Sequence, residues 1–170
     1  MPGASPLTDR CRAALGAHGH SLDDAQRQIV AKLEDLRRRL LARESRRSRI
    51  ARSLRLLAGT RRGVLRGLYL WGGVGRGKTF LLDQFFAELP LVEKRRDHFH
   101  RFMQEVHAGL RQHRDMPSPL ARVAENIAAR ARVLCFDEFA VSDIADATIL
   151  VALLSHGADQ PHSGPGCRIR

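Results

Sequence analysis

Apolar residues recur every three or four positions over much of this chain, and two short continuous apolar runs lie between the periodic stretches. The first periodic stretch begins near Ser21, a residue that can cap a helix. Its repeating apolar positions are Leu22, Ala25, Ile29, Leu33, Leu36 and Leu40. The period continues weakly to Leu57, and Gly59 and Gly63 end it. This pattern predicts one long helix with a single apolar face.

Strands and helices are expected to alternate after this first helix. The continuous apolar runs Leu68–Trp71 and Val133–Phe136 predict buried strands, and a further strand is expected over His98–Phe102. The predicted helices are Thr79–Leu89, a segment with Met103, Val106 and Leu110 on one face, Leu120–Arg130, and Asp143–Ser155. Alternation of this kind implies a parallel sheet covered by helices on both faces, so the expected fold class is α/β.

The two ends of the chain lack this periodicity. Residues 1–20 are rich in Gly, Ala, Pro and His, so we expect a flexible lead-in there. After His156 the sequence turns to Gly-Ala-Asp-Gln-Pro-His-Ser-Gly-Pro-Gly, and residues 157–170 are expected to be irregular. This composition suggests a shifted reading frame or a truncation, a hypothesis that sequencing the gene would test.

A glycine-rich loop directly follows the first predicted strand. It matches G-x-x-x-x-G-K-[ST] at every fixed position and consists of Gly72, Gly73, Val74, Gly75, Arg76, Gly77, Lys78 and Thr79. Glycines let successive backbone N–H groups turn inward and form an anion nest at a helix N-terminus. In this pattern Lys78 reaches the β- and γ-phosphates and Thr79 places its hydroxyl on Mg²⁺. The alternative is an ordinary glycine turn, which the flanking strand and helix disfavour.

Two acids end the second apolar run. Asp137 and Glu138 follow Val133–Phe136, in the chain order that brings two parallel strands side by side. We expect Asp137 to hold Mg²⁺ through its water shell and Glu138 to act as the catalytic base that polarises the attacking water. A surface acid at a strand end is the alternative for Glu138. With Lys78 and Thr79, these residues predict binding and hydrolysis of a nucleoside triphosphate.

The chain is strongly basic. Its 170 residues include 29 Lys and Arg against 18 Asp and Glu, a formal net charge of +11. Much of this charge lies in residues 32–66, which could attract nucleic acid, acidic lipids or an acidic protein. A solvated helix face is the simpler interpretation, and the segment contains no aromatic residue on which a base could stack.

Other chemistry finds little support in the sequence. Cys11, Cys135 and Cys167 form no CxxC pair, which favours a reducing, cytoplasmic compartment over a disulfide framework or zinc site. His98 and His100 would share one face of a strand, but no third metal ligand has a suitable spacing. Arginines in the acid-poor N-terminus give a weaker indication of mitochondrial import.

Four blocks of this sequence occur together in one known family. They are Asp24-Ala25-Gln26, Gly67–Thr79, His98–Met103 continuing to Val106 and His107, and Cys135–Phe139 with Val141, Asp143, Ile144, Asp146 and Ala147. In these blocks the chain resembles the ZapE/AFG-like ATPases, an AAA+-related family, over roughly Leu22–Leu154. The resemblance implies an AAA+-like P-loop NTPase fold, ATP as the nucleotide, and ATP hydrolysis that remodels a partner protein.

The resemblance also implies partners and a longer chain. Bacterial members act on the tubulin-like division-ring protein at the inner membrane face, and mitochondrial relatives act in respiratory-protein quality control. The resemblance therefore also implies that the protein could form homo-oligomers and associate peripherally with the inner membrane. Members continue into a strand with a sensor residue, an arginine finger and a lid, so without these segments binding could survive where hydrolysis does not. A nucleic-acid-associated AAA+ loader and a non-functional fragment remain as alternatives.

The expected domain organisation follows from these interpretations. Residues 1–20 form the lead-in, and 21–66 form a basic amphipathic helical segment. Residues 67–156 form a P-loop NTPase core that is incomplete at its C-terminal end, and 157–170 form the irregular tail.

Overall fold

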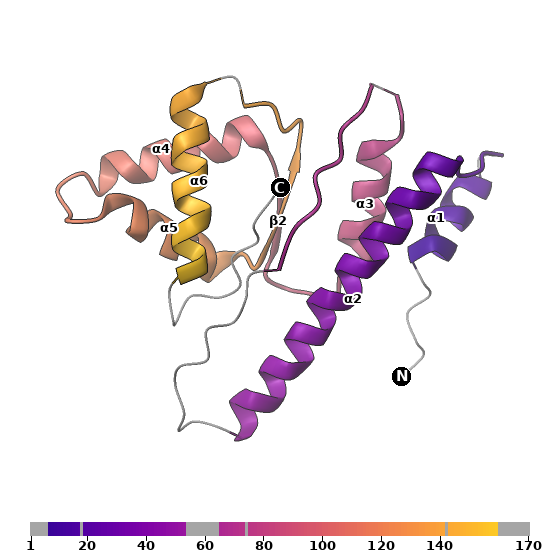
Figure 1. Ribbon diagram of the computed structural model, residues 1–170, viewed down its shortest axis with the longest axis horizontal. Coiled ribbons are helices and arrows are strands. Elements are labelled where there is room, and N and C mark those ends of the chain that lie inside the picture. The colour runs from indigo at the N-terminus through magenta and orange to yellow at the C-terminus, as the bar shows by residue number, and fades with distance from the viewer. Residues whose placement is uncertain (1–6, 18, 54–64, 74, 142, 160–170) are drawn as a thin grey trace. The chain divides into compact units, whose positions relative to one another are not determined.

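The computed structural model describes residues 7–17, 19–53, 65–73, 75–141 and 143–159. Its elements are α1 (Leu7–Gly16), α2 (Asp24–Ser53), α3 (Lys78–Glu88), β1 (Lys94–His98), α4 (Phe99–Gln112), α5 (Pro119–Arg130), β2 (Val133–Asp137) and α6 (Ile144–Asp159) (Figure 1). They form two compact units. The first unit contains α1, α2 and Gly67–Pro90 with α3, and the second contains β1 to α6. The protein is thus mixed α/β, with a small parallel sheet and flanking helices.

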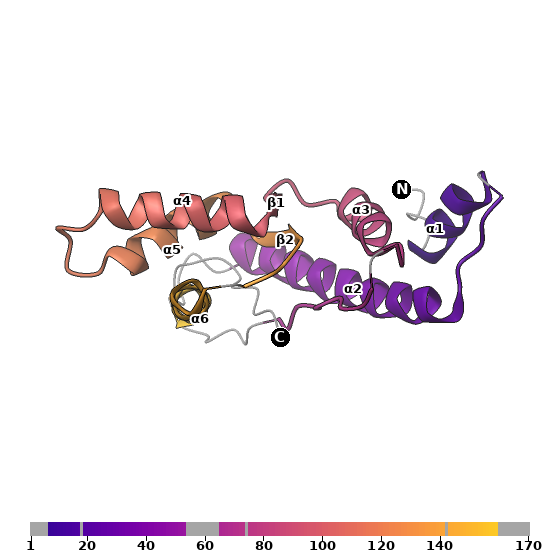
Figure 2. The ribbon, with the colours of Figure 1, turned by 90° about the horizontal axis from the view of Figure 1, so that it is seen from above.

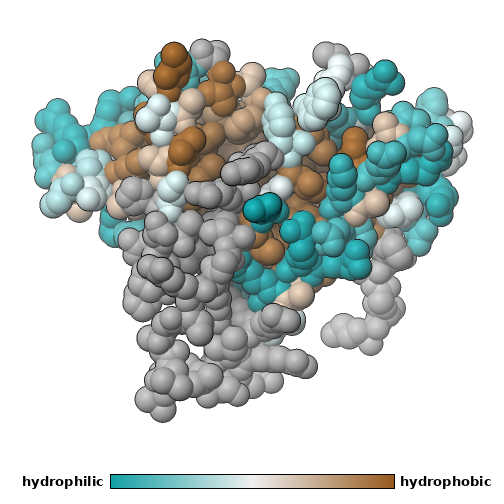
Figure 3. All heavy atoms as spheres, viewed as in Figure 1, coloured by the Kyte–Doolittle hydropathy of each residue, from teal (hydrophilic) through white to brown (hydrophobic). Residues whose placement is uncertain are grey.

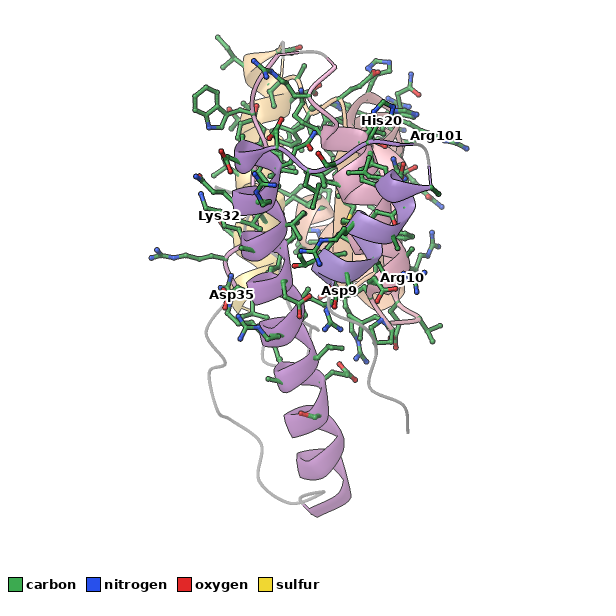
Figure 4. The ribbon with its side chains drawn as sticks, turned by 90° about the vertical axis from the view of Figure 1, so that its right-hand side faces the viewer. Asp9, Arg10, His20, Lys32, Asp35 and Arg101 are labelled. Carbon is green, nitrogen blue, oxygen red and sulfur yellow. The ribbon has the colours of Figure 1, made fainter. Side chains whose placement is uncertain are left out.

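The first unit is built on an N-terminal helix that was not predicted from the sequence. Residues 1–20 were expected to lack regular structure, but Leu7–Gly16 form α1. Leu7 and Cys11 lie one helical turn apart and are both fully buried, so a short apolar stripe was present in a segment otherwise dominated by small and polar residues. Arg10 on α1, labelled in Figure 4, pairs with the buried Glu88 of α3 at 2.6 Å. This pair joins α1 to α3.

The long helix α2 begins with a capping box centred on Asp23. The Gln26 backbone N–H donates to Asp23 Oδ1 at 2.7 Å, and the Asp23 N–H donates to Gln26 Oε1 at 3.1 Å. Two backbone donors at the helix start are satisfied reciprocally in this way. Asp23, rather than Ser21, therefore caps the helix. The predicted helix is confirmed over Asp24–Ser53, while residues 54–64 of the basic segment lie outside the described part of the chain.

A buried ion pair fixes α1 against α2. Arg37, only 8% exposed, donates to Glu34 through Nη2 at 2.9 Å and Nε at 3.0 Å. Glu34 Oε2 also accepts the backbone N–H of Leu7 at 3.2 Å. The hydrogen bonds from Arg37 lower the pKa of Glu34, and the Leu7 N–H adds to this effect, while burial acts in the opposite direction. The carboxylate form of Glu34 is thus the form that the folded protein favours.

We predict that Glu34→Gln removes part of the acid sensitivity of folding. Because the pKa of Glu34 is lowered on folding, its stabilising contribution is present above its ordinary pKa and is lost as pH falls through the folded value. The wild-type protein should therefore lose more stability than Glu34→Gln between pH 7 and about pH 3. At pH 7 the variant should unfold more easily, by about 2 kcal/mol. Urea unfolding at both pH values measures both effects.

Asp35→Asn is the matched control for this prediction. Asp35 is exposed, pairs with Arg39 at 2.9 Å, and lies on the edge of α2 that faces away from α1 (Figure 4). Its removal deletes the same charge from the same helix, but a surface ion pair contributes only about 0–1 kcal/mol. An equal change in the pH dependence for both variants would show that overall charge, rather than the buried pair, sets the effect.

The sheet of the second unit pairs β1 with β2 in parallel, from Lys94 opposite Val133 to His98 opposite Asp137. The strand β2 confirms the expectation for Val133–Phe136. The strand expected over His98–Phe102 is wrong, because β1 ends at His98 and α4 begins at Phe99. The buried residues of α4 are Phe99, Phe102, Met103 and Val106, whose spacing of three to four fits a helix and not a strand.

The core of the second unit lies where α4, α5 and α6 meet β2. The ring of Phe136 on β2 packs on Phe102 and Phe99, with centroid distances of 4.8 and 5.9 Å. Figure 2 shows α4 and α5 side by side, with β1 running directly into α4. His107 Nε2 and Asp146 Oδ1 lie 2.7 Å apart and join α4 to α6. This packing fixes the carboxyl end of β2, where the predicted acids lie.

Some apolar side chains of α6 remain at the surface. Figure 3 shows hydrophobic residues gathered there, and Ile144 and Val151 are 85% and 65% exposed. The helix continues to Asp159, beyond the point where irregular structure was expected, and residues 160–170 lie outside the described part. Among the described helices, none has both the length and the apolarity to cross a membrane.

The expected strand Leu68–Trp71 is also absent from the structure. These residues have no regular secondary structure, and Trp71 is 82% exposed rather than buried. A strand needs a hydrogen-bonded neighbour, and in the described residues the sheet consists of β1 and β2. Gly67–Pro90 belong to the same compact unit as α1 and α2. The single P-loop core expected over residues 67–156 remains a prediction.

Candidate functional site

The glycine loop opens α3 in a left-handed conformation. Gly75 and Gly77 have φ values of 81° and 75°, a region that a residue with a Cβ adopts only at a cost. Gly77 is also the N-cap of α3 and offers no side chain to the first N–H groups of the helix. A helix start with free N–H groups suits an anion such as a phosphate. Val74, another residue that we expect to bind phosphate here, lies outside the described residues.

Lys78, the first residue of α3, folds back across the loop. Its Nζ donates to the carbonyl oxygens of Gly72 and Gly73 at 2.8 and 2.7 Å. The ammonium group therefore lies at the beginning of the loop, although its backbone lies at the end. Thr79 follows it in the first turn of the helix and is exposed.

A residue from α2 also contacts the loop. Gln26 Nε2 donates to the Arg76 carbonyl at 3.2 Å, and a Cβ placed on Gly77 would lie 3.0 Å from the same nitrogen. Gln26 belongs to one of the family blocks, but no contact was predicted for it. The spacing of Asp23 and Gln26 is a capping signal that the sequence alone could have shown. The contact of Gln26 with the loop, by contrast, depends on the packing of α2 on α3.

The carboxylate of Asp137 ends β2 and is held by Arg96 of β1. Asp137 Oδ2 accepts hydrogen bonds from Arg96 Nε at 2.8 Å and Nη2 at 2.6 Å, and its side chain is 16% exposed. A cation at this oxygen would have to compete with the guanidinium group. Arg96 was not among the predicted site residues, because only the strand register places it beside Asp137.

Glu138 follows β2 in a strained backbone conformation. Its φ of 51° makes it the one non-glycine residue with positive φ in the part of the chain that the structure describes. A residue with a Cβ pays roughly 1–2 kcal/mol in this region, and such strain concentrates at functional sites. Glu138 is exposed directly beyond the strand end.

The structure thus brings the candidate residues together in two groups. Gly72–Thr79 share the first unit with Gln26, and Asp137 and Glu138 share the second unit with Arg96. The expected proximity of Thr79 to Asp137 remains a prediction. In the described residues, no three His, Cys, Asp or Glu side chains form a group that could hold a metal ion. Cys11 and Cys135 are buried, and neither forms a disulfide within the described residues.

Known proteins resemble this chain over most of its length. It is 40% identical over 154 residues to "Cell division protein ZapE" of Escherichia coli strain K12, which covers 86% of this chain and 41% of that protein. It is also 40% identical to "Uncharacterized protein C115.02c" of Schizosaccharomyces pombe over 105 residues and to "Lactation elevated protein 1 homolog B" of Danio rerio over 98 residues. These matches cover 56% and 51% of this chain and 23% and 20% of those proteins.

The chain therefore spans about two fifths of the length of the Escherichia coli relative, 41%. No solved structure matches it. The profile of the AFG1-like ATPase family matches residues 5–158, a range that includes the glycine loop, both strands and the acids that end β2. The resemblance found in the sequence blocks is thereby confirmed, and the chain belongs to the AFG1-like ATPase family.

Proposed function

We propose that this chain binds ATP together with Mg²⁺, and that Gly72–Thr79 hold the triphosphate. The observation that carries the proposal is the conformation of this loop, in which left-handed glycines lead into a helix start without a side-chain cap. The N–H groups at this end carry the positive pole of the helix. Lys78 adds a full positive charge to the same loop. Membership in an ATPase family supports ATP as the nucleotide.

Each charged or polar side chain has a proposed role. Lys78 moves its ammonium from the carbonyls of Gly72 and Gly73 to the β- and γ-phosphates. The hydroxyl of Thr79 and the carboxylate of Asp137 are the hard oxygen donors that Mg²⁺ prefers, so these residues would hold the ion. Bound Mg²⁺ would neutralise charge on the phosphate oxygens. Arg96 must release Asp137 Oδ2 if the ion uses that atom.

Hydrolysis is the second part of the proposal. Glu138, exposed just beyond the end of β2 in a strained backbone conformation, orients and deprotonates the attacking water as a general base. The whole family protein is longer than this chain, and its turnover, oligomeric state and partners are inferred from relatives. We propose that the intact protein uses ATP to remodel a cytoplasmic partner in bacterial cell division, which the name of the Escherichia coli relative supports.

The experiment that tests nucleotide binding is stabilisation of the chain by ATP with Mg²⁺. A ligand that binds only the folded state stabilises it by about 2.7 kcal/mol when its concentration is about a hundred times the Kd. Urea unfolding should therefore shift to higher denaturant with ATP and Mg²⁺, and less with ATP and EDTA. Sodium triphosphate at equal ionic strength separates charge screening from nucleotide recognition. An unfolding curve that is unchanged at millimolar ATP and Mg²⁺ would contradict the proposal.

A further inference from the structure

We propose that Gln26 is a positioning residue for the phosphate loop, because its side-chain amide joins the start of α2 to the Arg76 carbonyl. This inference rests on the proposed function, since it concerns the same loop. It adds a specific requirement, namely that the residue at position 26 must donate a hydrogen bond to the loop.

The orientation of the Gln26 amide is fixed by its two partners. Oε1 accepts the Asp23 N–H at 3.1 Å, and Nε2 donates to the Arg76 carbonyl at 3.2 Å. Rotation of the amide by half a turn would place Nε2 against an N–H donor and Oε1 against a carbonyl acceptor. One amide therefore serves both the capping box and the loop, and only its NH₂ end can serve the loop.

The contact with Arg76 determines the direction of a backbone N–H group in the loop. The carbonyl of Arg76 and the N–H of Gly77 belong to one peptide plane, and in a trans peptide they point in opposite directions. By holding the carbonyl, Gln26 turns the Gly77 N–H away from α2. This N–H is one of the free donors at the start of α3 that are proposed to meet the phosphates.

Gly77 leaves the space that this contact needs. A Cβ at this position would lie 3.0 Å from Gln26 Nε2, while a Cβ at Gly75 would meet nothing within 4 Å. Both glycines have positive φ, so backbone strain alone does not distinguish them. Gln26 therefore packs closely against the loop at the residue where α3 begins.

The test compares Gln26→Glu with Asp23→Ala. A glutamate side chain in place of Gln26 can still accept the Asp23 N–H, so the capping box survives, but its carboxylate faces the Arg76 carbonyl without a proton to donate. We expect the Kd for ATP with Mg²⁺ to rise about tenfold, with little change in the urea midpoint. Asp23→Ala removes the cap and leaves the loop contact, so it should lower the urea midpoint while the Kd stays within about twofold.

The matched control for added charge is Gln28→Glu. Gln28 is exposed near the start of the same helix, so this change brings the same negative charge to the first unit without touching the loop. Its Kd should remain within about twofold of the wild-type value. An equal loss of affinity in Gln26→Glu and Gln28→Glu would overturn the inference.

The pH dependence adds a readout that a purely structural role would not change. As pH falls from about 8 to about 5, the carboxylate introduced by Gln26→Glu becomes partly protonated and can donate to the Arg76 carbonyl. The ratio of the Kd of Gln26→Glu to that of Gln28→Glu should therefore decrease. A constant ratio, or affinity that falls in step with stability in both Gln26→Glu and Asp23→Ala, contradicts the inference. Failure of the wild-type protein to bind ATP would instead refute the proposed function itself.

Discussion

Lys78→Ala is expected to weaken binding of ATP with Mg²⁺ at least about a hundredfold. In the folded chain, Lys78 Nζ already lies over the loop, bonded to the carbonyls of Gly72 and Gly73. Hydrogen bonds to charged groups contribute about 1.5–3 kcal/mol each, so loss of contacts to two phosphates corresponds to at least about 3 kcal/mol. Isothermal titration of both proteins with ATP and Mg²⁺ measures the difference directly.

Two controls accompany this prediction. Lys32→Ala removes the same charge from an exposed site on α2, labelled in Figure 4, and should change the Kd less than about twofold. Lys78→Ala also removes two hydrogen bonds within the loop, so circular dichroism must show that α3 remains folded. A Kd close to the wild-type value, with the helix intact, would rule out Lys78 as a phosphate ligand.

Phe102→Ala is expected to destabilise the second unit by about 3–5 kcal/mol. Phe102 is fully buried, and its ring packs against Phe136 of β2 with a centroid distance of 4.8 Å. Truncation leaves a cavity between α4 and the strand whose end carries Asp137. Because small domains are stable by only about 5–15 kcal/mol, this loss is a large fraction of the total. Urea unfolding followed by circular dichroism gives its size.

Ile144→Ala on α6 is the control for this core substitution. Ile144 is 85% exposed, so its truncation removes apolar surface that water already contacts and should change stability by less than about 0.5 kcal/mol. If both variants lost the same stability, the core would not lie where the structure places it. A large loss of stability in Ile144→Ala would mean that the Ile144 side chain is buried in solution.

The sequence by itself determined the features that depend on local pattern. The periods of three and four predicted α2, α3, α5 and α6, and the continuous run Val133–Phe136 predicted β2. The glycines of Gly72–Thr79 located the loop, because glycine is favoured where the backbone is left-handed. The apolar residues that recur every three or four positions after Thr79 located α3. The same blocks were sufficient to identify the family.

Local pattern failed where two periods competed or where a segment was short. The His98–Phe102 stretch begins with alternating residues, but the buried positions Phe99, Phe102 and Met103 follow a helix. Leu68–Trp71 is apolar enough for a strand, yet Trp71 is exposed and the segment has no place in the β1–β2 sheet. In α1, burial of Leu7 and Cys11 gives a marginal sequence its helix.

Only the tertiary structure decided which distant side chains meet. The pairing of Arg96 with Asp137 depends on strand register, and that of Gln26 with Arg76 depends on how α2 packs beside α3. Glu34 lies 27 positions from Leu7 yet accepts its N–H. Residue types and spacings specify contacts within about one turn of a helix or along one strand, whereas contacts between elements depend on how whole faces pack together.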